Sequence, residues 1–215
     1  MRPRNVIGRV CVITDTTVQS FFTHTDLATL ACTGGADIIQ LRDKHLSDDD
    51  MITVGREIRH VCDRYDARFI VNDRVQVARA CGADGVHLGR ADASVDEARR
   101  VLGDTAIIGA TAHSFQEALR ADRSLADYVG FGHVYATTSK QKETPPVGLE
   151  ELARVCSAVS LPVLAIGGIT SERVADVMRA GAWGIAVIAD VCASDDPRAA
   201  TERIRRAVAV TFPHA

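Results

Sequence analysis

Two cations and an amide side chain stand close together in the segment Gln40-Leu41-Arg42-Asp43-Lys44, which ends an apolar run. If that run is a β-strand, side-chain alternation sends Gln40, Arg42 and Lys44 to the same side. A guanidinium, an ammonium and an amide that converge on one point suit the oxygens of a phosphate or pyrophosphate. A solvated basic pair beside neighbouring aspartates is the alternative explanation of the same residues.

Two carboxylates follow the next two apolar runs. Asp73 comes directly after Asn72, and Asp92 comes four residues after Leu88. Together they suit one Mg²⁺ ion, which takes few protein oxygens and keeps water and substrate phosphate as its other ligands. Taken singly, each aspartate is better explained as a helix cap, but beside the Gln-Arg-Lys segment the pair indicates a metal and pyrophosphate site. His87 can be explained equally well as an interior, hydrogen-bonded histidine or as a catalytic residue.

Hydroxyl groups, a histidine and a further cation follow the fifth and sixth apolar runs. Thr111 and His133 come first, and the polar stretch after them contains Thr137, Thr138 and Lys140. The stretch from Thr137 to Pro146 is interpreted as a flap over bound anions, with an ordinary solvated loop as the alternative. The same mouth is therefore expected to offer hydroxyls, imidazole and a third cation.

The last two apolar runs end in Gly167-Gly168 and in Ile188-Ala189-Asp190. These are the places where (β/α)8 barrels commonly bind a phosphate through backbone N–H groups. We therefore expect Gly168, Ile188 and Ala189 to line a phosphate subsite.

Eight short, β-branched runs recur along the chain and predict the strands that position these residues. Between them lie segments of helical periodicity, which begin with the capping serines Ser47, Ser94, Ser114 and Ser171. Near-continuous hydrophobic strands that alternate with amphipathic helices indicate a parallel sheet covered by helices. Eight units of about 27 residues fit an α/β fold, a single (β/α)8 TIM barrel, whose catalytic face lies at the carboxyl ends of the strands. A doubly wound open sheet is the competing fold. The predicted strands are 10–14, 38–42, 69–72, 85–88, 106–110, 128–131, 162–166 and 184–188.

Two glycines are predicted to end helices. Gly82 and Gly181 each stand between a helical segment and the next predicted strand, where glycine accepts the left-handed conformation.

The composition fits one globular domain and excludes several partner classes. The 215 residues are 47% apolar and 25% charged, with a formal net charge of -3, so no broad positive field favours nucleic acid or an anionic membrane. The apolar runs are far shorter than the roughly 20 residues that span a bilayer, and the first residues lack a signal-peptide core. We expect a cytoplasmic protein that binds small molecules, neither nucleic acid nor membrane, with a homo-oligomer left open. The six cysteines form no C-x-x-C pair and are predicted to be free, buried thiols.

With these pieces in order, the sequence resembles the thiamine phosphate synthase and thiazole tautomerase family over almost the whole chain. The motifs QLRDK, VNDR, GADGVHLGRAD, GATAHS, DYVGFGHVYATTSK and PVLAIGGIT carry the resemblance. It implies one TIM-barrel domain, residues 1–215, that acts as a transferase in thiamine biosynthesis. The implied substrates are a pyrimidine pyrophosphate and a thiazole phosphate, and the implied cofactor is Mg²⁺.

The resemblance also implies roles for residues of this chain. The pyrophosphate would be held by Gln40, Arg42 and Lys44 with Asn72 nearby, and Mg²⁺ by Asp73 and Asp92. Thr111, in place of the family's usual serine, and Lys140 would be catalytic residues of a synthase, with Lys140 reaching the pyrophosphate from the flap. His133 would be the catalytic residue of a tautomerase. The thiazole phosphate would meet Gly168, and the remaining substrate contacts would come from Thr137, Thr138, Ile188 and Ala189.

The sequence departs from the synthase pattern at three places. His133 replaces a proline and resembles the tautomerase branch, in which a histidine shuttles a proton as general acid and base. Arg90 replaces a glutamine beside the metal site, and Ala189-Asp190 replaces a small hydroxylic residue near the phosphate. A tautomerase has no pyrophosphate to release and no need of the Gln-Arg-Lys and aspartate set, so the synthase is preferred. A tautomerase using His133 and a non-catalytic regulator that binds a thiamine precursor are the alternatives.

Overall fold

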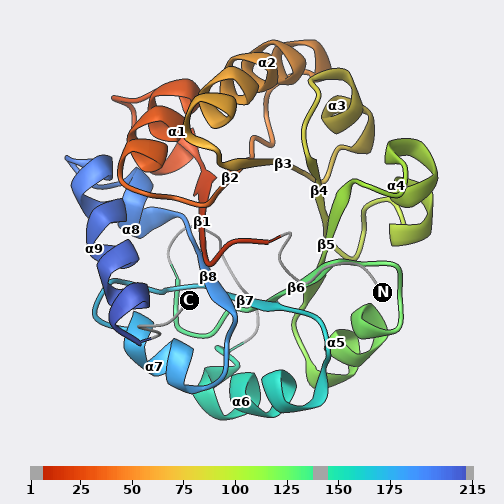
Figure 1. The fold of residues 1–215 in the computed structure, drawn as a ribbon, viewed down its shortest axis with the longest axis vertical. Helices are drawn as coiled ribbons and strands as arrows, with labels where there is room; N and C mark the ends of the chain where they lie inside the picture. Colours follow the sequence, from red (N-terminus) through yellow and green to blue (C-terminus); the bar gives the residue numbers. More distant parts are fainter. Residues whose placement is uncertain (1–6, 138–144, 212–215) are drawn as a thin grey trace.

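The computed structural model describes residues 7–137 and 145–211. Eight parallel strands follow one another around a closed barrel, and β1 pairs with β8 to complete it (Figure 1). The closure confirms the TIM barrel and rules out the open sheet. The strands are β1 (Val10–Thr14), β2 (Ile38–Leu41), β3 (Arg68–Asn72), β4 (Gly85–Leu88), β5 (Ile107–Ala112), β6 (Tyr128–Gly132), β7 (Val163–Ile166) and β8 (Gly184–Val187).

Helices form an outer ring around the strands, as Figure 1 shows. Most of them join one strand to the next, while the short α8 and the long α9 follow β8. The ring consists of the 3₁₀ helix η2 (Thr16–Val18) and the helices α1 (His24–Thr33), α2 (Asp48–Tyr65), α3 (Val75–Ala80), α4 (Val95–Leu102), α5 (Phe115–Asp122), α6 (Gly148–Ala158), α7 (Val174–Arg179), α8 (Ala189–Cys192) and α9 (Pro197–Thr211).

Three of the four predicted serine caps are confirmed. The side chains of Ser47, Ser94 and Ser114 each accept a backbone N–H in the first turn of α2, α4 and α5. The prediction for Ser171 was wrong: α7 begins at Val174, its N-cap residue is Arg173 rather than Ser171, and no side chain caps it. The Ser171 hydroxyl donates to the Glu172 carboxylate.

Both predicted glycine turns are confirmed. Gly82 has φ +69° and Gly181 has φ +95°, a backbone region that favours glycine. Each turn ends a helix and leads into an even-numbered strand, β4 or β8.

The apolar core has two layers. One layer packs the helices against the outside of the barrel, and the other fills the barrel interior, where Cys11, Ile13, Tyr128 and Leu164 are buried. The six cysteines are free thiols, as predicted, and five of them are buried. Among the described residues, no helix combines the length and the apolar character that crossing a membrane requires.

Candidate active site

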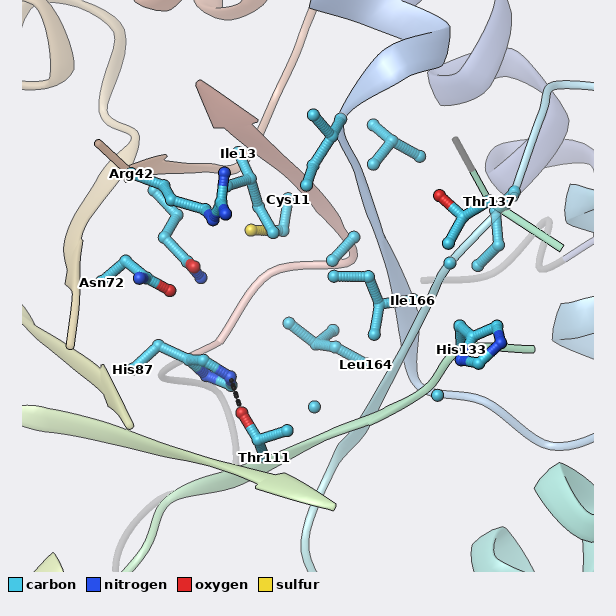
Figure 2. A pocket seen from close by; sticks show the side chains of 18 of the residues that line it. Cys11, Ile13, Arg42, Asn72, His87, Thr111, His133, Thr137, Leu164 and Ile166 are labelled. Atoms are coloured by element: carbon cyan, nitrogen blue, oxygen red, sulfur yellow. Dashed lines mark hydrogen bonds between the residues drawn. The ribbon is translucent and has the colours of Figure 1, made fainter. Parts of the chain in front are cut away.

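A cavity of about 830 Å³ opens at the carboxyl ends of the strands, and all eight strands contribute to its lining. Its floor is the apolar interior of the barrel, where Figure 2 shows Cys11, Ile13 and Leu164. Polar side chains gather around this floor, so a ligand would meet an apolar base and a charged rim. This is where barrel enzymes carry their chemistry.

The structure brings the expected site residues together. Twelve of the fourteen line this cavity, namely Gln40, Arg42, Lys44, Asn72, Asp73, Asp92, Thr111, His133, Thr137, Gly168, Ile188 and Ala189. The other two, Thr138 and Lys140, lie outside the described residues. Most of the flap that we expected from Thr137 to Pro146 lies there as well.

Arg42 and Lys44 reach the cavity for a different reason from the one we expected. Strand β2 ends at Leu41, so strand alternation governs Gln40 but not the two cations. The Arg42 guanidinium is held by the carboxylate of Asp15, which is only 1% exposed. Lys44 forms an ion pair with Asp73 across the rim. The buried Asp15 and the half-buried Asp73 therefore hold the two cations at the rim of the cavity.

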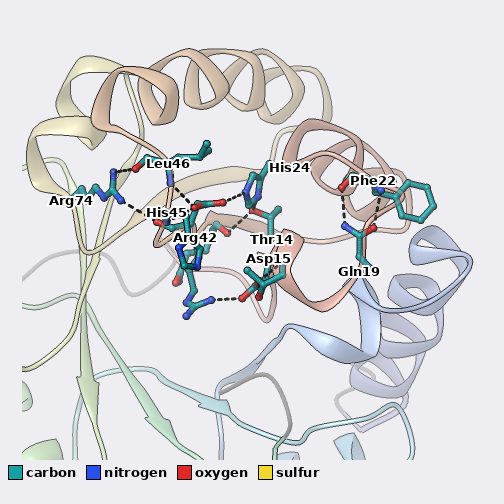
Figure 3. A network of polar contacts seen from close by, with 12 residues as sticks. Thr14, Asp15, Gln19, Phe22, His24, Arg42, His45, Leu46 and Arg74 are labelled. Carbon is teal, nitrogen blue, oxygen red and sulfur yellow. Dashed lines mark hydrogen bonds and ion pairs between the residues drawn. The ribbon is translucent and has the colours of Figure 1, made fainter. Parts of the chain in front are cut away.

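A network of hydrogen bonds fixes the turn that follows β2 (Figure 3). The Asp43 carboxylate accepts the backbone N–H groups of His45 at 2.7 Å and Leu46 at 2.8 Å. Its other oxygen lies 3.1 Å from His24 Nε2, and His24 Nδ1 lies 2.8 Å from the Thr14 hydroxyl. Burial by itself raises the pKa of Asp43, but these hydrogen bonds outweigh it and lower the pKa to about 2. Asp43, which stands between the two cations in the sequence, is thus an anion at neutral pH.

The two carboxylates that we expected to bind metal lie against each other. Asp73 has φ +65°, a left-handed conformation that is uncommon for residues other than glycine. The Asp92 carboxylate accepts the Gly89 N–H at 2.6 Å. The pKa of Asp92 is raised first by burial and then by its hydrogen bond to Asp73 and the charge of that residue. Two acids pressed together beside a cation fit a divalent ion that bridges them and completes its shell with ligand oxygens.

Within the described part of the chain, no cluster of three or more potential metal-ligating side chains is present. A metal at Asp73 and Asp92 would therefore depend on water and substrate for its remaining ligands.

His87, which the sequence left ambiguous, stands between two hydroxyl groups. Its Nδ1 lies 2.9 Å from the Tyr128 hydroxyl, and its Nε2 lies 2.9 Å from Thr111 Oγ1, the bond drawn in Figure 2. A Cβ atom on Gly109 would lie 2.1 Å from the Tyr128 ring, and one on Gly130 would lie 2.7 Å from the His87 ring. Sequence reasoning missed Tyr128, although Gly109 on β5 and Gly130 on β6 were a sign that rings occupy the space beside them.

His133 and Asp190 shape the side of the cavity near β7 and β8. His133 is 6% exposed and lines the cavity, and Figure 2 shows it beyond Ile166 on the side away from Arg42. Asp190 also lines the cavity. The acid that stands beside the place of the family's small hydroxylic residue therefore belongs to the end of the cavity near β8. Its pKa is raised by burial and by the charge of Glu172. The cavity therefore has two cations, each paired with an aspartate, at the β2 end and a half-buried acid at the β8 end.

A closed parallel barrel with cations, carboxylates and glycine turns around one cavity at its carboxyl ends defines a phosphate-handling TIM barrel. The model of the thiamine monophosphate synthase family matches residues 10–191, and the chain belongs to this family.

Relatives and solved structures agree with that assignment. A thiamine-phosphate synthase of Methanoculleus marisnigri is 49% identical, over 92% of this chain and 94% of that protein. One of Salinibacter ruber is 44% identical, over 96% of this chain and 91% of that protein. The solved thiamine phosphate pyrophosphorylase of Pyrococcus furiosus is 38% identical and superposes with a TM-score of 0.88, over 95% of this chain and 96% of that one.

Proposed function

We propose that this chain is a thiamine-phosphate synthase, a transferase that joins a pyrimidine pyrophosphate to a thiazole phosphate and releases pyrophosphate. The observation that carries the proposal is the meeting of Arg42, Lys44, Asp73 and Asp92 at one rim of the cavity. The names of relatives that share 44–49% of their residues with the chain support it. We propose small-molecule substrates in the cytoplasm, without nucleic acid as a partner.

The reaction needs positive charge at the leaving group rather than a nucleophile from the protein. Loss of pyrophosphate leaves a pyrimidinyl-methyl cation whose ring delocalises the charge, and the thiazole nitrogen then attacks this carbon. Arg42 and Lys44 would stabilise the departing anion. Asp73 and Asp92 would hold Mg²⁺, which supplies further positive charge to the pyrophosphate. The apolar floor would exclude water from the cation.

Substrate binding would rearrange the rim. Lys44 and Asp73 form an ion pair with each other. When a pyrophosphate and a divalent ion bind, Lys44 would turn to the anion and Asp73 to the cation. The ion pair between the two side chains would then be replaced by two ion pairs, one with the pyrophosphate and one with the metal. The backbone around Gly167 and Gly168 would receive the thiazole phosphate at the other end of the cavity.

A paired assay on the purified protein tests this function. We expect thiamine phosphate from the pyrimidine pyrophosphate and the thiazole phosphate with Mg²⁺, and none after chelation of the metal. The same preparation is given the carboxythiazole phosphate tautomer alone. Isomerisation without condensation would overturn the synthase and would assign tautomerase chemistry to His133, whose buried place in the cavity wall makes it the group to suspect. Tight binding of a precursor without either reaction would indicate a regulator.

A further inference from the structure

The side chains of Tyr128, His87 and Thr111 form a chain of hydrogen bonds from the barrel interior to the cavity. Tyr128 is 1% exposed, at the floor, while Thr111 is half-buried and lines the cavity. The role of Tyr128 in this series of hydrogen bonds follows from which group donates and which accepts in each bond.

The buried hydroxyl of Tyr128 sets that direction. Its pKa is raised well above the usual value because it is buried, so it remains a phenol and carries a proton that must be donated. Among residues 7–137 and 145–211, His87 Nδ1 is the acceptor within reach of this hydroxyl, at 2.9 Å. Nδ1 therefore accepts, and the neutral ring carries its proton on Nε2.

The second bond runs in the same direction. Since Nε2 is protonated, it donates to Thr111 Oγ1 at 2.9 Å. The Thr111 oxygen thus acts as an acceptor towards the protein, and its own proton is left to donate. No other hydrogen-bond partner of Thr111 occurs in the described part of the chain, and its side chain borders the cavity.

We infer that Tyr128 is a positioning residue which, through His87, fixes Thr111 as a hydrogen-bond donor to an anionic phosphate oxygen of the bound substrate. The class of acceptor follows from the surroundings, because Arg42 and Lys44 line the same cavity and favour an oxyanion there. A threonine without this constraint could rotate and accept instead. The chain of bonds removes that freedom before the substrate arrives, which is the preorganisation that stabilises developing charge.

Two glycines keep the chain of bonds in place. A Cβ on Gly109 would lie 2.5 Å from His87 Nδ1, and a Cβ on Gly130 would lie 2.7 Å from His87 Cε1. A side chain at either position would displace the imidazole from between its two hydroxyl partners.

The test removes one hydroxyl group at a time by substitution. Tyr128→Phe removes the donor at the floor and leaves Nδ1 without it, so the ring can change tautomer and Thr111 loses its fixed direction. The kinetic part rests on the proposed condensation: we expect kcat to fall about tenfold, with KM changed less than about twofold. Tyr65→Phe is the matched control, because that tyrosine lies on α2 and its hydroxyl pairs with Thr33 at 3.2 Å. It should retain the wild-type kcat.

A double variant separates positioning from general damage. Thr111→Val removes the hydroxyl and should lower kcat about 100-fold. Adding Tyr128→Phe to Thr111→Val should cause no further loss, since Tyr128 acts through the Thr111 hydroxyl. Thermal unfolding of each variant confirms that it is folded at the assay temperature. Additive losses would overturn the inference.

The ring tautomer gives a readout that does not depend on the proposed function. In ¹⁵N NMR of the labelled protein, His87 should show a protonated Nε2 and an unprotonated Nδ1, and this pattern should weaken in Tyr128→Phe. A protonated Nδ1 in the wild type would overturn the inference even if condensation is found. If the protein does not condense the two substrates, the proposed function fails, and the inference is then judged on the affinity for inorganic pyrophosphate. Tyr128→Phe should lower this affinity about tenfold although it changes KM little, because free pyrophosphate carries the negative charge that the substrate acquires only as the leaving group departs.

Discussion

The Arg99 guanidinium lies 2.6 Å from the Asp127 carboxylate, at the end of the barrel opposite the cavity. The same carboxylate oxygen accepts the backbone N–H of Ile108 at 2.8 Å, and the guanidinium also donates to the carbonyls of Ala106 and Leu125. One ion pair therefore joins the end of α4 to the starts of β5 and β6. Arg99 is 5% exposed, so this pair is shielded from water.

The arrangement recurs around the barrel. An aspartate stands directly before β2, β4 and β6, and each accepts a backbone N–H at the start of the preceding strand and pairs with an arginine. The three sets are Asp37 with Val10 and Arg205, Asp84 with Phe69 and Arg59, and Asp127 with Ile108 and Arg99. Trp183 occupies the matching place before β8 and donates its indole N–H to the Ile7 carbonyl.

The more deeply buried of these ion pairs should contribute more to the free energy of unfolding. Arg99→Met leaves Asp127 without the Arg99 charge and several backbone carbonyls without the Arg99 donor, which should lower the free energy of unfolding by about 3 kcal/mol. Arg205 is 46% exposed, so Arg205→Met should cost less than about 1 kcal/mol. Urea unfolding at pH 7 measures both. Equal losses would contradict the ranking, and a changed kcat in folded Arg99→Met would contradict the separation of this end from the site.

Acid should remove the stabilisation that Asp43 provides. Its pKa is about 2 in the folded protein, below the ordinary value of 3.8. The unfolded chain therefore takes up the proton first as the pH falls, and the stabilisation is complete above about pH 4 and is lost between pH 4 and pH 2. The full contribution is about 2 kcal/mol. The free energy of unfolding of the wild type and of Asp43→Asn is measured at a series of pH values, and the difference between them should shrink by that amount from pH 4.5 to pH 2. If the two free energies fall in parallel, the low pKa of Asp43 is refuted.

His24 should matter for binding of the pyrophosphate-bearing substrate. It ties Asp43, and with it the turn that carries Arg42 and Lys44, to α1 and β1. Under the proposed function, His24→Ala should raise the KM for the pyrimidine pyrophosphate about tenfold, because the two cations lose their fixed positions. The KM for the thiazole phosphate should stay within about twofold. His60→Ala is the control, since that histidine is exposed on α2. A loss shared equally by both substrates would argue against this role.

The sequence predicted the fold and the residues that line the cavity better than it predicted how those residues are oriented. Repeated apolar runs located all eight strands, because a parallel strand buried on both faces has few polar residues. It also placed Arg42 and Lys44 at the mouth, but for the wrong reason: the strand stops at Leu41, and Asp15, far away in sequence, orients Arg42. The Tyr128 contact with His87 was missed since it joins β6 to β4 over Gly109 of β5. A glycine within one strand can signal that a ring occupies its space, but it does not identify which residues of the other strands meet there.

The two candidate activities of this family should respond oppositely to two substitutions. Asp73→Ala removes a carboxylate that would hold the metal, and under the proposed function it should lower Mg²⁺-dependent condensation at least about 100-fold. His133→Ala should retain most of the condensation, because His133 lies at the other side of the cavity from Arg42 (Figure 2). A tautomerase would show the reverse sensitivity, since proton transfer needs an imidazole but no leaving-group charge. Condensation rates at saturating and at limiting Mg²⁺ measure the first effect. Full condensation by Asp73→Ala at limiting Mg²⁺ would show that this carboxylate does not hold the metal.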